Sequence, residues 1–206
     1  ITVELMQAIR DLPSVCEFVH FPIQAGSNRI LKKMHRIYTL ETYLEKVALL
    51  KKIVPNISLG TDIIVGFPTE TEQEFQQTYD ILKEIRYSIA FIFSYSARKG
   101  TPAFRWRDDI PEEIKQERLQ SLLQLHEQIC TEQRHELLGS YLEVLVEKRT
   151  KDKNLKGRSR CWKSVIFAGE DFLIGSLQTI KITGFTNQTL LGELVPHLSL
   201  LKAFNH

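Results

Sequence analysis

The polar residues of this chain that could do chemistry lie on short apolar segments and recur at alternate positions. Residues 57–66 alternate between a bulky apolar set and a set that is small or polar apart from Ile64, and residues 17–24 and 88–96 show a similar division. Because successive side chains of a β-strand point to opposite faces, each segment would present its polar set on one face. Three such strands side by side would share a lining of His20, Gln24, Asp62, Gly66 and Ser94.

This shared face would be costly inside a packed core. Small residues leave voids there, and a buried aspartate without a partner carries the full cost of its desolvation. We therefore interpret the face as the lining of a cavity. For any one of these residues alone, a core position with its own hydrogen-bond partner is an equally good interpretation, and only the set together favours the cavity.

The apolar run of residues 57–65 ends abruptly at Gly66, which is followed by Phe and Pro. Ligands of α/β folds bind at the carboxyl ends of strands, and a glycine there lets a flat ligand approach the backbone. Residues 69–72, Thr-Glu-Thr-Glu, have the form of a helix capping box. A plain strand end with a helix cap is therefore the alternative interpretation, although it leaves Gly66 and the role of Glu70 unexplained.

A second candidate binding element is Gly26-Ser27, directly before a predicted helix over residues 28–36. The first N–H groups of a helix are unpaired and can hold a carboxylate or a phosphate. The alternative is an ordinary helix cap by Ser27, and most sequences of this kind are caps.

Basic and aromatic residues are interleaved in two segments, 98–107 and 148–163, and the second contains a single acid, Asp152. Positive charge combined with stacking surface suits single-stranded RNA. The alternatives are aromatic residues that pack on their own domain in the first segment and a solvated loop in the second. The RNA-binding candidates are Arg98, Arg105, Trp106, Lys148, Arg149, Lys156, Arg158, Arg160, Trp162 and Lys163.

The elements that must position these residues alternate between strands and helices. Helical spacing predicts helices over 40–53, with Thr39 as cap, and over 71–85, between the three predicted strands. This alternation predicts right-handed βαβ units with a parallel sheet, too few to close a barrel. A helix over 112–138, ended by Gly139, then leads to short strands that predict a small β-barrel. We therefore predict two domains, residues 1–138 and 139–206.

Composition excludes several classes of protein. The 206 residues carry a net charge of +2 and contain no apolar run long enough to span a membrane. The first residues lack the features of a signal peptide. The three cysteines, Cys16, Cys130 and Cys161, are far apart and include no C-x-x-C, which indicates no metal site and suits a reducing cytosol. Because the chain begins with Ile1, we expect a piece of a longer protein.

Several long motifs, in order and spacing, resemble the radical S-adenosylmethionine methylthiotransferases. They are "HFPIQAGSNRILKKMHRIYTLETY", "TDIIVGFPTETEQEF" and "FIFSYSARKGTPA", and residues 139–195 resemble the TRAM domain, an RNA-binding β-barrel. The first motif resembles the branch that acts on tRNA, since the branch acting on a ribosomal protein tends to have an acidic residue at the position of His20. The third favours the enzyme acting on isopentenylated adenosine, with the enzyme for threonylcarbamoyl-adenosine as a near neighbour.

The resemblance implies an α/β fold, a partial (βα)₆ radical-SAM barrel holding strands four to six, followed by the TRAM barrel. It implies S-adenosylmethionine as cofactor, with residues 66–70 on its adenine side and Gln24 and Ser27 near its ribose and methionine. Ala25, where the family often has Ser, is a mild departure. The cofactor-binding candidates are His20, Gln24, Ser27, Asp62, Gly66, Glu70 and Ser94.

The larger departure is an absence. The family carries a C-x-x-x-C-x-x-C loop for a four-iron, four-sulfur cluster and an auxiliary cluster in an amino-terminal domain, and this sequence contains neither ligand set. Because thiolates hold such clusters, we predict a carboxyl-terminal fragment that is inactive alone. The full-length protein would be a cytoplasmic enzyme that inserts a methylthio group into a tRNA adenosine beside the anticodon, with two such clusters.

Other functions remain open from the sequence. They are a stand-alone RNA-binding adaptor and a methylthiotransferase for threonylcarbamoyl-adenosine in tRNA or for a ribosomal protein. The expected partner is tRNA, with no membrane. A partial barrel would also leave an unpaired strand edge, through which we expect the fragment to self-associate.

Overall fold

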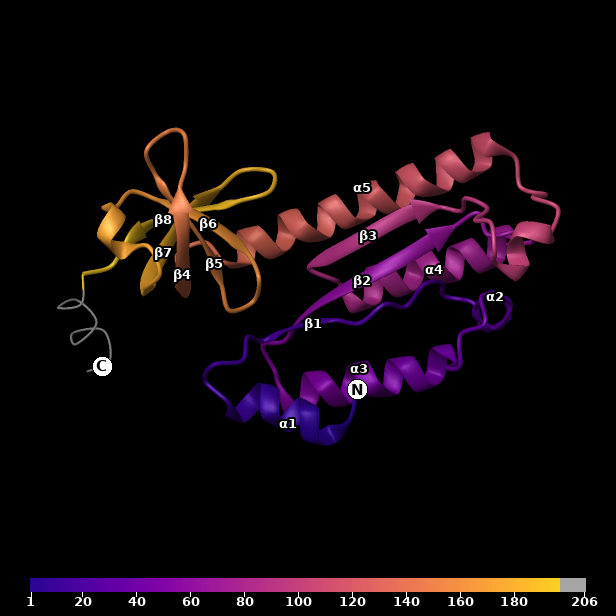
Figure 1. The fold of residues 1–206 in the computed structure, drawn as a ribbon, viewed down its shortest axis with the longest axis horizontal. Coiled ribbons are helices and arrows are strands. Elements are labelled where there is room, and N and C mark those ends of the chain that lie inside the picture. Colours follow the sequence, from indigo (N-terminus) through magenta and orange to yellow (C-terminus); the bar gives the residue numbers. More distant parts are fainter. Residues whose placement is uncertain (197–206) are drawn as a thin grey trace. The chain divides into compact units, whose positions relative to one another are not determined.

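A computed structural model describes residues 1–196 of the chain, which divides into two compact units between Cys130 and Thr131. The division falls within the long helix α5 (Glu112–Glu136), so that this helix contributes to both units (Figure 1). The domain boundary that the sequence predicts, between residues 138 and 139 at the end of this helix, stays a prediction. Among the described residues, no helix combines the length and the apolar character needed to cross a membrane.

Unit 1 is built from alternating helices and strands around a three-stranded parallel sheet of order β1-β2-β3 (Figure 1). The predicted α/β fold class with a parallel sheet is thereby confirmed. Its elements are α1 (Val3–Asp11), β1 (Phe18–His20), α2 (Asn28–Lys33), α3 (Leu40–Ile53), β2 (Ser58–Val65), α4 (Glu72–Ile85), β3 (Ile89–Ser94), η1 (Pro102–Arg105) and the first part of α5.

The bulky face of β2 packs against the helices, as its alternation predicts. Leu59, Ile63 and Val65 are at most 3% exposed and belong to one apolar cluster with Leu50 of α3 and Leu82 of α4. Burying each such side chain contributes roughly 1.5–3 kcal/mol, so this face fixes which side of the sheet the helices cover. The opposite face of β2 is left free of these helices.

Strand β1 is shorter than the predicted strand over residues 17–24. Regular pairing ends at His20, and beyond it only Gln24 forms a further parallel bridge, with Ile63 of β2. Pro22 has no N–H to donate to a ladder. The side-chain oxygen of Thr61 instead accepts from the backbone N–H of Ile23 at 3.0 Å. The chain therefore leaves the sheet early.

Helices α2, α3 and α4 of unit 1 are capped by Ser27, Thr39 and Thr71, whose hydroxyls accept from the first turns of these helices. The predicted caps by Ser27 and Thr39 are confirmed. The predicted capping box over residues 69–72 is wrong, because the box lies two residues later, on Thr71 and Glu74. Thr69 belongs instead to the turn before the helix, where its φ is 73°.

Unit 2 contains a closed five-stranded barrel of order β4-β5-β6-β8-β7, which confirms the predicted small β-barrel (Figure 1). Along its strands buried and exposed residues alternate, and the buried ones form one core cluster in which Val144, Val165 and Ile180 are 0% exposed. The elements are β4 (Tyr141–Arg149), β5 (Leu155–Ser159), β6 (Ser164–Phe167), η2 (Asp171–Leu173), β7 (Leu177–Phe185) and β8 (Leu190–Leu194).

Candidate functional site

His20 and Asp62 meet on the face of the sheet that the helices leave free, as the sequence predicts. Parallel pairing places His20 beside Gly60, and His20 Nε2 lies 3.3 Å from Asp62 Oδ2. Their side chains are 38% and 33% exposed, so both remain accessible. A Cβ on Gly60 would come within 2.9 Å of the imidazole, which means that glycine makes room for the ring.

The third strand contributes aromatic rings to this face, which corrects the prediction for Ser94. In the register of β2 and β3, Asp62 pairs with Phe91 and Val65 pairs with Ser94. Partners in a parallel ladder share a face, so Ser94 lies on the helix-covered side with Val65. Phe91 and Phe93 lie on the free side and are 53% and 54% exposed. Sequence reasoning missed them because large apolar residues on a strand look like core.

Gln24 does not continue the alternation that the sequence predicts. It bridges Ile63, which belongs to the helix-covered set of β2, and its φ is 69°. Its side chain is buried, with the residue 6% exposed. The structure therefore brings His20 and Asp62 together and leaves Gln24 and Ser94 out of their shared face. Their role in binding a cofactor stays a prediction.

The backbone at Gly66 forms a tight turn just after β2. Its φ is 69°, a region that favours glycine, and a Cβ there would lie 2.4 Å from Cγ of Lys115 on α5. Glycine is therefore required by the local backbone and by packing against Lys115. The space that the missing Cβ leaves is occupied by protein, so the ligand approach that we predicted at this atom has no room on that side.

Glu70 is buried and serves this turn. Its Oε2 accepts from the Gly66 backbone N–H at 2.7 Å and from Nη1 of Arg118 at 2.8 Å. Burial raises the pKa of the Glu70 carboxyl, while the Gly66 amide and Arg118 act in the opposite direction. The side chain is 0% exposed. In this structure Glu70 therefore stabilises the turn inside the protein, and its predicted role as a ligand contact stays a prediction.

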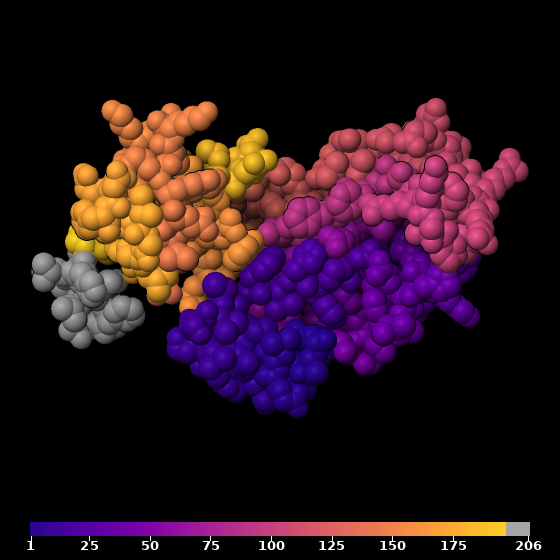
Figure 2. All heavy atoms as spheres, in the orientation of Figure 1, coloured from indigo at the N-terminus to yellow at the C-terminus, as the bar shows by residue number. Residues whose placement is uncertain are grey.

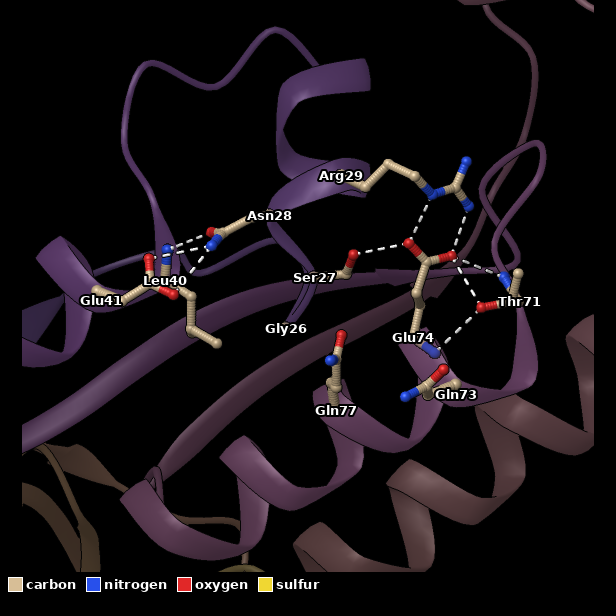
Figure 3. A pocket seen from close by; sticks show the side chains of 10 residues that line it. All are labelled: Gly26, Ser27, Asn28, Arg29, Leu40, Glu41, Thr71, Gln73, Glu74 and Gln77. Carbon is tan, nitrogen blue, oxygen red and sulfur yellow. Dashed lines mark hydrogen bonds and ion pairs between the residues drawn. The ribbon is translucent and has the colours of Figure 1, made fainter.

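Ser27 lies in a separate cavity of about 470 Å³, between the first turns of three helices (Figure 3). Its hydroxyl donates to Oε1 of Glu74 at 2.8 Å, and Arg29 Nε donates to the same oxygen at 2.8 Å. The Arg29 hydrogen bond is the main cause that lowers the pKa of Glu74 to about 2. The lining residues are Gly26, Ser27, Asn28, Arg29, Leu40, Glu41, Thr71, Gln73, Glu74 and Gln77.

This cavity does not extend to the face that holds His20 and Asp62. Both of its carboxylates are already engaged, since Glu41 accepts from the Asn28 amide at 3.0 Å and Glu74 accepts from Arg29. Ser27 is therefore a helix cap within a polar network, which is the plainer of the two interpretations from the sequence.

The RNA-binding candidates of the loop before α5 divide between exposed and packed residues. Arg98 and Arg105 are exposed. The ring of Trp106 meets the ring of Phe67 edge-on at 5.8 Å, and Lys33 Nζ lies 5.5 Å from the Trp106 ring centre. Trp106 thus packs on its own unit, as the alternative interpretation held, while 36% of it stays exposed.

On the barrel, several of the RNA-binding candidates form a partly exposed surface. The Arg158 guanidinium stacks 4.2 Å from the ring centre of Trp162, which is 42% exposed. Lys148 and Lys156 are register partners on β4 and β5, so two like charges face each other across the ladder. The hairpin loop between these strands, near residue 150, projects from the unit (orange in Figure 2).

Other basic candidates are engaged within the barrel unit. Arg149 hydrogen-bonds to Asp171 and to the Gly169 carbonyl, and Lys163 Nζ donates to Gln133 at 3.2 Å. Arg160 lies 3.5 Å from Glu143, an ion pair on the outer face. Arg149, Arg160 and Lys163 therefore have structural partners, and Arg158 Nε lies 3.6 Å from Oε1 of Glu147. Lys148 and Lys156 are the better placed to meet an anion.

Comparisons with known proteins agree with this architecture. Residues 1–82 match the model of the Radical SAM superfamily, and residues 136–195 match the TRAM domain. The chain is 67% identical over 196 residues to "tRNA-2-methylthio-N(6)-dimethylallyladenosine synthase" of Protochlamydia amoebophila, covering 94% of this chain and 44% of that protein. It is 47% identical over 195 residues to the protein of that name from Thermoanaerobacter pseudethanolicus, covering 93% and 41%.

The chain therefore spans less than half the length of the curated relatives that it matches. The chain is also similar to a solved structure of coproporphyrinogen III oxidase from Escherichia coli, which is titled a radical SAM enzyme. The match covers 92% of this chain and 48% of the oxidase chain, with 12% identity. The TM-score of this match is 0.49. The two domain matches and the two relatives confirm the resemblance that the motifs carried. Residues 1–82 are thus similar to the Radical SAM superfamily, and residues 136–195 are similar to the TRAM domain.

Proposed function

We propose that this chain is part of a tRNA methylthiotransferase that acts on isopentenylated (dimethylallyl) adenosine beside the anticodon. The observation that carries the proposal is the 67% identity, over 94% of the chain, to a protein named for that reaction. The presence of both a Radical SAM segment and a TRAM domain in one chain supports it. The partner is then tRNA, and the compartment is the cytoplasm.

The free face of the sheet fits a nucleoside-bearing cofactor such as S-adenosylmethionine. His20 and Asp62 offer hydrogen-bonding groups there, and Phe91 and Phe93 beside them offer exposed aromatic surface on which a base can stack. With an iron–sulfur cluster, the cofactor supplies the radical chemistry that removes hydrogen from a carbon atom. In this proposal, the four side chains bind and orient it.

Ligands for an iron–sulfur cluster are not part of the described chain. Cys16 is exposed in unit 1, Cys130 is buried on α5 and Cys161 belongs to unit 2. Within residues 1–196, no three His, Cys, Asp or Glu side chains gather as a metal site. The proposal therefore places the two four-iron, four-sulfur clusters on residues of the full-length protein outside this chain, and the chain alone is expected to be inactive.

The barrel is the proposed tRNA contact. Two lysines that face each other across a ladder, Lys148 and Lys156, repel unless an anion lies between them, and a phosphate of the RNA backbone would meet that need. The exposed ring of Trp162, stacked on Arg158, offers a surface for an unpaired base.

Mass spectrometry of tRNA nucleosides from a strain without the gene tests the proposal. The expected result is loss of the methylthio group from isopentenylated adenosine, with the unmodified isopentenyl form accumulating. If the threonylcarbamoyl nucleoside or a ribosomal protein loses its methylthio group instead, the proposed assignment of isopentenylated adenosine as substrate is wrong. If no methylthio group is lost, the stand-alone RNA-binding adaptor is favoured.

A further inference from the structure

The turn from Gly66 to Glu70, just after β2, holds a conformation that its residues do not favour alone. Gly66 has a φ of 69° and Thr69 a φ of 73°, and a left-handed backbone is uncommon for threonine. Such a conformation persists where the surroundings fix it. The fixing contacts come from other elements: the backbone N–H of Thr69 donates to Asp109 at 2.7 Å, and Lys33 Nζ donates to the Thr69 hydroxyl at 2.6 Å.

Arg29 of α2 donates to the Thr69 hydroxyl and to the Thr69 carbonyl, and Arg118 of α5 contacts the turn at Glu70. Arg118 Nη1 donates to Oε2 of Glu70 at 2.8 Å and to the Glu70 carbonyl at 3.2 Å, while Nη2 donates to Glu72 at 3.0 Å. The same Oε2 accepts from the Gly66 N–H at 2.7 Å. The Arg118 guanidinium therefore binds the Glu70 carboxylate, which in turn accepts from the backbone N–H at the end of β2. It also binds the Glu70 carbonyl, just before α4.

The environment makes this arrangement specific to arginine at position 118. Its side chain is 7% exposed, and its guanidinium carbon lies 5.3 Å from the ring centre of Phe75. Three donated bonds in one plane need the fork of a guanidinium, which the single ammonium of lysine does not reproduce. Lys115, one turn earlier on α5, fills the space beside the Gly66 Cα. Helix α5 therefore shapes the turn from two positions.

We propose that Arg118 is a positioning residue for cofactor binding: through Glu70 it fixes the Gly66–Glu70 turn beside the face that holds the cofactor. This inference rests on the proposed function, which places the cofactor on the sheet face that holds Asp62. The turn directly follows β2, the strand that carries Asp62. Arg118 does not touch the cofactor. Its effect is to keep the strand end in one conformation, so that the cofactor does not have to order it on binding.

The test compares Arg118→Gln, Arg118→Lys and Glu117→Gln in the full-length protein. Glu117→Gln is the matched control, since Glu117 is an exposed neighbour on the same helix. Hydrogen exchange of the peptide covering residues 64–72 is the first measurement. Arg118→Gln is expected to speed exchange there, Arg118→Lys to speed it less, and Glu117→Gln to leave it unchanged. Unchanged exchange in Arg118→Gln would overturn the proposal, whatever the protein binds.

Equilibrium binding of S-adenosylmethionine, without turnover, is the second measurement. Loss of hydrogen bonds to a buried charged group should raise the dissociation constant by roughly tenfold or more in Arg118→Gln, with tRNA binding unchanged. Faster exchange together with unchanged cofactor affinity would reject the role in cofactor binding. If the wild-type protein does not bind S-adenosylmethionine, the proposed function fails, while exchange still decides whether Arg118 fixes the turn.

The unfolding temperature of each variant distinguishes a loss of cofactor binding from a general loss of folding stability. If Arg118→Gln lowers it so far that the protein unfolds, Arg118→Lys becomes the deciding variant, because it keeps the charge. Weaker cofactor binding by a folded Arg118→Lys supports the proposal, and wild-type affinity in that variant overturns it.

Discussion

At the scale of single residues, the carboxylates of unit 1 are mostly occupied by the protein itself. Glu70 holds a strand end through the Gly66 amide and Arg118, and Glu74 ties the caps of two helices together through Ser27 and Thr71. The accessible carboxylate of the free sheet face is Asp62, beside His20. Chemistry toward a ligand is therefore expected at the His20–Asp62 pair, and the buried carboxylates set the local stability.

Glu74→Gln is expected to destabilise the chain in a pH-dependent way. Because the folded pKa of Glu74, about 2, lies below its ordinary value of 4.5, its contribution is complete above about pH 4.5 and is lost as pH falls toward 2. Because Arg29 is half exposed, we expect Glu74→Gln to lower the free energy of unfolding at neutral pH by roughly 1–3 kcal/mol. Urea unfolding at pH 7 and pH 3 measures this. Glu84→Gln, exposed on the same helix, is the control; equal losses for Glu74→Gln at both pH values would contradict the explanation.

Gly66→Ala is expected to destabilise unit 1 more than Gly100→Ala. Both glycines have positive φ, 69° and 89°, so both substitutions carry the backbone penalty. Only at Gly66 would the new Cβ meet another atom, Cγ of Lys115 at 2.4 Å; at Gly100 nothing lies within 4 Å. We expect the free energy of unfolding to fall by about 1–3 kcal/mol in Gly66→Ala and by less in Gly100→Ala. Chemical denaturation of both variants tests the order, and a larger loss at Gly100 would refute the steric part of the argument.

At the scale of elements, the register between neighbouring strands decides which side chains lie next to one another. Pairing of Asp62 with Phe91 puts aromatic rings, and not Ser94, beside the His20–Asp62 pair. On the barrel, the register of β4 and β5 opposes Lys148 and Lys156. In both units, a binding surface arises from two neighbouring strands and is invisible in either strand alone.

Replacing Lys148 and Lys156 with Ala is expected to weaken tRNA binding and to leave folding stability unchanged or slightly improved. Each lysine that contacts a phosphate should reduce the slope of log affinity against log salt by roughly one. Like charges opposite each other cost stability, so their removal should not unfold the barrel. Filter binding over a series of salt concentrations measures the slope. Lys181→Ala, exposed on β7, is the control, and an unchanged slope for the double variant would rule out phosphate contact.

At the scale of the whole molecule, the chain combines a three-stranded parallel sheet with a closed barrel. The barrel has no free edge, because its five strands pair in a ring. The sheet of unit 1 has two edge strands, β1 and β3, and its free face exposes Phe91 and Phe93. Any tendency of this chain to self-associate is therefore expected to come from unit 1.

Light scattering over a range of protein concentrations tests that expectation. We expect the 206-residue chain to shift from monomer to dimer or larger species as concentration rises. A monomer of the whole chain at high concentration would contradict the prediction.

The sequence by itself determined the fold class of both units, the caps at Ser27 and Thr39, and the strand faces on which His20 and Asp62 lie. These follow from local periodicity and side-chain chemistry, which are properties of short segments. The long motifs also carried the resemblance to the radical S-adenosylmethionine methylthiotransferases, because they keep residue type and spacing together.

Only the tertiary structure decided where Ser94, Gln24 and Glu70 lie. The face of Ser94 depends on the register between β2 and β3, and Gln24 leaves the alternation because its backbone turns at φ 69°. Glu70 is turned inward because Arg118, 48 residues away in the chain, supplies the charge that a buried carboxylate needs. Register and long-range ion pairs are set by packing between elements, and no local pattern contains them.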